Sequence, residues 1–107
     1  MGAAKIRALN DAFRTTMSGG RVMMTAGVQA LGEKTVASAL TAVREFTAFS
    51  ADTDPYKEHD FGSFEIAGRK FFWKIDAYDA EMQFGSEDPA DPSKTTRVLT
   101  IMLAEEY

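Results

Sequence analysis

One short stretch of this chain alternates apolar and polar residues on both sides of a turn, a pattern typical of a β-hairpin. Phe64 and Ile66 alternate with polar neighbours, and Ala67 and Gly68 supply a two-residue turn. Apolar residues recur at every second position in the returning segment, residues 71–76. Because both faces of that segment carry aromatic rings, we expect the hairpin to lie centrally in a sheet that helices cover on one side.

Two segments have the three-and-four spacing of amphipathic helices. They run from Ala3 to Met17 and from Glu33 to Phe46 or Thr47. Their apolar stripes consist of Ile6, Leu9, Phe13 and Met17 in the first segment, and of Val36, Leu40, Val43 and Phe46 in the second. Residues 18–20, Ser-Gly-Gly, are expected to end the first helix, and residues 27–32 to form a turn before the second.

Three further segments complete the expected fold. Arg21 to Thr25 and Thr95 to Leu103 have strand character, and residues 104–107 are a candidate continuation of the last strand. Residues 81–94 hold glycine and proline among polar residues and are expected to form a long exposed loop. We therefore expect a single domain, residues 1–107, of the α+β class. It should have a largely antiparallel sheet of about four strands with two helices packed on one face, in the order α-β-α-β-β-β.

The composition excludes several classes of protein. The chain has no cysteine, so disulfides, thiolate zinc sites, iron–sulfur clusters and cysteine nucleophiles are excluded. It has no apolar run near the ~20 residues of a membrane span, and its first residues lack the pattern of a secretory signal. We expect a cytoplasmic protein that binds no membrane and needs no cofactor.

Charge is distributed unevenly along the chain. Residues 1–50 carry six basic and three acidic residues, whereas residues 51–92 carry four basic and eleven acidic residues. No Lys or Arg lies between Lys74 and Lys94, where six carboxylates are found: Asp76, Asp79, Glu81, Glu87, Asp88 and Asp91. This stretch repels phosphate backbones, so we expect no direct nucleic-acid binding and a protein partner with a basic surface. The simpler interpretation is a solvated loop that serves solubility.

The single histidine, His59, is flanked by carboxylates. An imidazole beside Asp60 could act in acid–base catalysis, and Asp54, His59 and Asp60 are candidate ligands of a divalent metal. Adjacent residues of an extended segment point to opposite sides, however, and the spacing matches no established metal motif. The simplest interpretation is a loop histidine that hydrogen-bonds a nearby turn.

Several short motifs together resemble one protein family. They are Asn10-Asp11-Ala12-Phe13-Arg14, Gly19-Gly20-Arg21-Val22, Glu58-His59-Asp60-Phe61-Gly62, Phe72-Trp73-Lys74-Ile75-Asp76 with Tyr78-Asp79, Asp88-Pro89-Ala90-Asp91-Pro92, and Arg97-Val98-Leu99-Thr100-Ile101-Met102-Leu103. The chain resembles a family of short alphaproteobacterial proteins known as domain of unknown function 3768. The resemblance implies no activity and no catalytic residues. It implies a setting, that of small accessory proteins of plasmids and other mobile elements.

These observations favour a small acidic, non-enzymatic binding protein. In the implied setting, it is expected to be an anti-defence inhibitor, such as an anti-CRISPR or anti-restriction protein, whose six carboxylates occupy a basic nucleic-acid-binding surface. The alternative is a small metal-dependent or acid–base enzyme centred on His59. A third option is a homodimer that pairs through its last strand.

Overall fold

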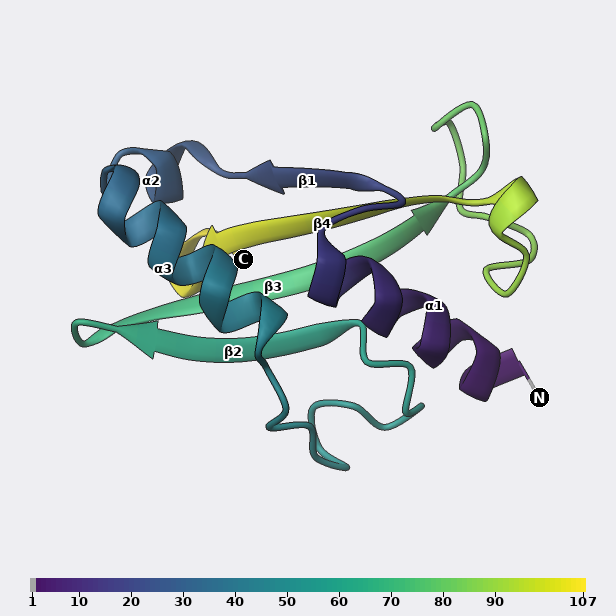
Figure 1. The fold of residues 1–107 in the computed structure, drawn as a ribbon, viewed down its shortest axis with the longest axis horizontal. Coiled ribbons are helices and arrows are strands. Elements are labelled where there is room, and N and C mark those ends of the chain that lie inside the picture. Colours follow the sequence, from purple (N-terminus) through teal and green to yellow (C-terminus); the bar gives the residue numbers. More distant parts are fainter. Residues whose placement is uncertain (1) are drawn as a thin grey trace.

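The computed structural model describes residues 2–107 and contains one four-stranded mixed sheet (Figure 1). Its strands are β1 (Arg21–Met24), β2 (Phe61–Ile66), β3 (Arg69–Tyr78) and β4 (Thr96–Leu103), in the spatial order β1-β4-β3-β2. Both pairings of β3 are antiparallel, whereas β1 runs parallel to β4. The expected α+β class and the largely antiparallel sheet are therefore confirmed.

Within residues 2–107, three α-helices accompany the sheet. The two long ones, α1 (Gly2–Thr16) and α3 (Glu33–Arg44), lie on the same face of the sheet, as expected (Figure 1). The third, α2 (Ala26–Gln29), is a single helical turn in the segment for which we expected a plain turn. Its N-cap is Thr25, whose hydroxyl oxygen accepts the N–H of Val28, and Val28 is fully buried. No helix in the described part of the chain combines the length and the hydropathy needed to cross a bilayer.

The hairpin of β2 and β3 has the register that the alternation predicts. Ala67 and Gly68 form its turn with φ angles of 52° and 80°, which is the left-handed backbone of a type I′ turn. Phe64 and Phe71 face each other across the ladder, and their stacked rings have centroids 5.1 Å apart. The local pattern thus determines both the turn and the pairing.

The core fills the space between the sheet and the two long helices. The odd-numbered side chains of β3, Phe71, Trp73 and Ile75, point toward the helices and are buried. Gly62 on β2 lies opposite Trp73, and a Cβ atom there would collide with the indole and with the ring of Phe46. Position 62 is therefore restricted to glycine by packing, because the tryptophan occupies the space that any larger residue would need.

The chain after β4 turns away from the sheet instead of extending the strand. Residues Ala104–Glu106 form a 3₁₀ turn, η2. The carboxylate of Glu106 accepts the N–H of Leu103 at 2.8 Å, the hydroxyl of Thr25 at 2.6 Å and the N–H of Gly27 at 3.2 Å. The hydrogen bond from Thr25 is the first cause of the lowered pKa of Glu106. The expected continuation of the strand is wrong because this carboxylate closes a turn and ties it to α2.

Strand β4 lies inside the sheet, between β1 and β3. Strand β3 pairs with the whole of β4 on one side, and β1 pairs with Val98 to Ile101 on the other, so β4 has no continuous free edge with which to recruit a second copy. The central place of β4 therefore argues against pairing of two chains through the last strand. The free edges of the sheet, among the described residues, are those of β1 and β2.

Candidate functional site

His59 is held in place by a carboxylate of its own loop. Asp54 is only 5% exposed, and one of its oxygens accepts the backbone N–H groups of Glu58 and His59, both at 3.1 Å. Its other oxygen lies 3.6 Å from Nε2 of the imidazole. Asp54 thus forms the loop turn that carries His59 and faces its ring, as the interpretation of a turn-bonded histidine predicts.

A second carboxylate reaches His59 from α1. Nδ1 of His59 lies 2.9 and 3.0 Å from the two oxygens of Asp11, which is 48 positions away in the sequence. The imidazole also stacks on the ring of Phe49, with centroids 3.7 Å apart and planes 1° from parallel. The ring is therefore held by its hydrogen bond at Nδ1 and by stacking on one face, with Asp54 close to its other nitrogen. Neither Asp11 nor Phe49 was expected to contact His59, since spacing along the chain gives no information about so distant a contact.

Beside this histidine, Arg14 of α1 binds the end of α3. Its guanidinium donates to the carbonyls of Val43 at 2.7 Å and Phe46 at 3.0 Å, and it pairs with Asp11 at 3.0 Å. It also lies 5.3 Å from the ring centre of Phe49. Arg14 is nearly fully buried and supplies donors at the end of α3, where the carbonyl of Val43 also accepts the N–H of Phe46 at 3.3 Å.

A further buried polar side chain of α1 connects the loops to the sheet. The amide of Asn10 donates to the carbonyl of Glu58 at 2.9 Å, and its oxygen accepts from Nε of Arg97 on β4 at 2.7 Å. Arg97 also donates to the carbonyl of Pro89, and burial lowers the pKa of its guanidinium. Asn10, Asp11 and Arg14 thus form a polar network on α1. It contacts the loop before β2 directly and, through Arg97, the loop between β3 and β4. These three polar residues lie next to the apolar stripe of α1 in the sequence, and that position is the signal by which they could have been identified.

This geometry restricts the chemistry of which His59 is capable. An Asp that orients Nδ1 is a feature of acid–base sites, but such a site also needs a second nitrogen open to substrate. Here Nε2 faces Asp54, and the adjoining surface hollow measures about 240 Å³. No group of three or more His, Asp or Glu within residues 2–107 could hold a metal ion, so the structure does not assemble Asp54, His59 and Asp60 as ligands. The arrangement favours a structural role.

Asp60 lies next to His59 in the chain, but its carboxylate forms no ion pair with the imidazole among the described residues. Its backbone carbonyl accepts the N–H of Ile75 at 2.8 Å, which extends the pairing of the hairpin. Burial is the first cause that raises the pKa of its carboxyl, and the charges of Asp54 and Asp76 raise it further. The carboxyl of Glu58 also has a raised pKa, again through burial first.

The six carboxylates expected to meet a partner occupy two places. Asp76 lies on the face of the sheet opposite the helices, where it pairs with Lys74 at 2.8 Å. The other five belong to residues 79–95, here called the acidic loop, in which Lys94 is the single basic residue. Lys94 lies 3.7 Å from Glu87, and both side chains are largely exposed.

The acidic loop is organised by its own hydrogen bonds. Asp79, Asp88 and Asp91 each accept a backbone N–H from a residue two to four positions onward. The hydroxyl of Thr95 donates to the carbonyl of Asp88 at 3.0 Å and lies 2.7 Å from the hydroxyl of Ser86. Three of the five carboxylates of the acidic loop thus shape it with one oxygen while leaving the other oxygen available.

The acidic loop surrounds a hollow and presents an aromatic ring. Asp79, Glu81 and Glu87 contribute to the lining of the hollow, which has a volume of about 380 Å³ and also includes Lys94. Phe84, in the same loop, is 71% exposed. This ring was not singled out from the sequence, although a large apolar residue within a polar stretch is a signal that could have found it.

Comparison with known proteins gives one match. A protein-family model described as "Protein of unknown function (DUF3768)" matches residues 24–106, so the motifs before residue 24 lie outside the matched region. No curated protein and no solved structure matches the chain. The matched region includes β2, β3 and β4, the segment of His59 and the whole acidic loop. This protein belongs to the DUF3768 family.

Proposed function

We propose that this protein is a non-enzymatic binding protein that uses the acidic loop, together with Asp76, to dock on a basic surface of a protein partner. The observation that carries the proposal is the hollow lined by Asp79, Glu81 and Glu87, in a loop with five carboxylates and one lysine. A cluster of one sign of charge in a concave surface attracts the opposite charge and speeds association.

Two further features support a binding role for the acidic loop. Its internal hydrogen bonds hold the carboxylates in place, so less conformational entropy is lost when a partner binds. Phe84 adds an exposed aromatic ring within the charged surface. Buried aromatic anchors surrounded by polar contacts carry much of the energy of protein interfaces.

We further propose that the partner's surface is one that ordinarily binds nucleic acid. Its lysines and arginines would meet carboxylates in place of phosphates, and the protein would then inhibit nucleic-acid binding by competition. The setting implied by the family resemblance, that of accessory proteins of mobile elements, supports a role as an anti-defence inhibitor of a CRISPR or restriction system. The net charge of the chain is only −4, so the proposal concerns a local patch and not mimicry of a DNA duplex by the whole surface.

Charge reversal in the acidic loop tests this proposal. The wild type, the variant Asp79→Lys/Glu81→Lys/Glu87→Lys and a control variant with three exposed acidic residues reversed elsewhere are each used for affinity capture from a bacterial lysate. The control substitutions are Glu45→Lys, Asp52→Lys and Glu65→Lys, which produce the same change of net charge. We expect the wild type and the control to retain a nucleic-acid-binding complex that the loop variant loses. Retention of the same proteins by all three would contradict the proposal.

A further inference from the structure

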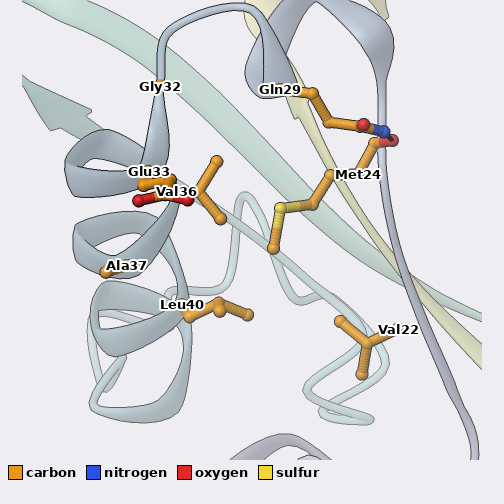
Figure 2. A pocket seen from close by; sticks show the side chains of 8 residues that line it. All are labelled: Val22, Met24, Gln29, Gly32, Glu33, Val36, Ala37 and Leu40. Atoms are coloured by element: carbon orange, nitrogen blue, oxygen red, sulfur yellow. Dashed lines mark hydrogen bonds between the residues drawn. The ribbon is translucent and has the colours of Figure 1, made fainter.

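A second surface, distinct from the acidic loop, lies between the edge strand β1 and helix α3. Figure 1 shows α2 and the start of α3 at one end of the molecule and the acidic loop at the other. The groove has a volume of about 580 Å³, within the range of ligand pockets. Val22 and Met24 of β1 form one wall, and Val36, Ala37 and Leu40 of α3 form the other. In Figure 2, the side chains of Val36 and Leu40 extend toward Met24 and Val22 across an open space, and Ala37 lies at the outer side of α3.

The backbone of β1 identifies the kind of ligand that this groove would take. The N–H of Thr25 donates to the carbonyl of Ile101, and backbone groups alternate between the two edges of a strand. Val22 and Met24 therefore direct their N–H and C=O groups away from β4, toward the free edge. The side chain of Gln29 confirms this direction, because its amide donates to the carbonyl of Met24 at 2.9 Å.

Edge groups next to an apolar groove suit an extended peptide. A strand added beside β1 would exchange hydrogen bonds with Val22 and Met24, and every second side chain would enter the groove. A lipid or a compact apolar molecule could fill the groove but would leave the strand edge unused. The amide of Gln29 mimics one bond of such an added strand.

Charge at the groove specifies the peptide further. Glu33, at the start of α3, is the only charged residue among those that line the groove, and it is exposed. A lysine or arginine in the bound segment would complement it. We infer that the groove between β1 and α3 binds an extended segment of a partner protein by strand addition, with apolar residues at alternate positions and a basic residue facing Glu33. This inference goes beyond the proposed function, which uses the other end of the molecule.

A library of random dodecapeptides displayed on phage is the probe for this site. We expect selection on the wild-type protein to enrich sequences with alternating apolar residues and a Lys or Arg near one end. Selection on Glu33→Lys should replace that basic residue by an acidic one. No enrichment, enriched sequences without alternation, or an unchanged charge preference on Glu33→Lys would overturn the inference.

Two substitutions then test the binding mode with a selected synthetic peptide. Val22→Pro removes an outward N–H that β4 does not use, so the fold should tolerate it while the peptide loses about tenfold in affinity. Ala37→Trp places a large ring at an exposed position that lines the groove. We expect this variant to lose at least as much peptide affinity as Val22→Pro. Ser38→Trp, on the outer face of the same helix, is the matched control and should bind normally.

Each remaining outcome has a definite meaning. A peptide that tolerates Val22→Pro but not Ala37→Trp would show that the groove accepts apolar groups without strand addition, which overturns the inference. Binding that is insensitive to both substitutions would place the peptide elsewhere and would also overturn it. Reversal of Asp79, Glu81 and Glu87 should leave peptide affinity unchanged, so failure here is distinguishable from failure of the acidic-loop proposal.

Discussion

Arg14→Met is expected to be among the most destabilising single substitutions in this protein. The guanidinium donates to the carbonyls of Val43 and Phe46 and to the carboxylate of Asp11, at distances between 2.7 and 3.0 Å. Hydrogen bonds to charged groups contribute about 1.5 to 3 kcal/mol each, and a buried carbonyl left without a donor costs about 1 to 3 kcal/mol. Methionine keeps much of the apolar contact and removes a buried charge, which offsets part of the loss. We therefore expect a decrease of about 3 to 5 kcal/mol in the free energy of unfolding.

Urea denaturation measures this decrease directly. Trp73 is the only tryptophan and is fully buried, so its fluorescence reports the loss of the core into which Arg14 packs. The midpoint should fall while the slope with denaturant stays the same. Arg44→Met, at an exposed position on α3, is the control and should change stability by no more than about 0.5 kcal/mol. A loss below about 1 kcal/mol for Arg14→Met would refute the view that this residue joins α1 to the end of α3.

Three further substitutions test other parts of the structure. Burial raises the pKa of Asp60, so the folded state binds its proton more tightly than the unfolded state and ionisation of this carboxyl opposes folding at neutral pH. Asp60→Asn should therefore raise the melting temperature at pH 7, and this advantage should shrink as the pH falls from the raised pKa of the folded state toward the ordinary pKa of an aspartate, below which it is lost. An unchanged or pH-independent difference would count against this. Gly62→Ala should lower the free energy of unfolding by about 1 to 3 kcal/mol, because the added methyl group meets the indole of Trp73. Gly2→Ala, at a position with open space around it, should have little effect. Equal effects of the two substitutions in urea titrations would contradict the packing argument. His59→Ala should lower the melting temperature, because it removes a side chain that lies between the carboxylates of Asp11 and Asp54. Magnesium, manganese or zinc should not raise the melting temperature of the wild type. A metal-dependent rise that His59→Ala abolishes would support the metal-site alternative instead.

Local patterns were sufficient to predict most of the secondary structure. Hydrophobic periodicity and turn chemistry act over a few residues. They were enough to predict the hairpin around Ala67 and Gly68, both long helices and strand β4. Helix α2 was missed because a single turn is too short to show a period. The continuation of β4 was predicted wrongly, since the hydrogen bonds of Glu106 to Thr25 and Gly27 join distant parts of the chain.

The candidate site was less accessible to sequence reasoning. His59 and Asp54 are near neighbours in the sequence, and their association was anticipated. Asp11 and Arg14 reach the same cluster from α1, and no local pattern predicts which helix will lie against a given loop. The groove beside β1 likewise depends on the parallel pairing of β1 with β4, a contact between the two halves of the chain. These features depend on tertiary packing, which is determined by many residues of the chain together and not by any short segment.

We propose above that the acidic loop competes with nucleic acid for a basic surface on a partner. The most direct measurement is an electrophoretic mobility shift assay, in which the complex captured by the wild type is loaded with its own nucleic acid and then titrated with this protein. Competition should release free nucleic acid when the wild type is added, and the variant with Asp79, Glu81 and Glu87 reversed to lysine should release none. A slower-migrating ternary complex, or equal release by both proteins, would contradict it.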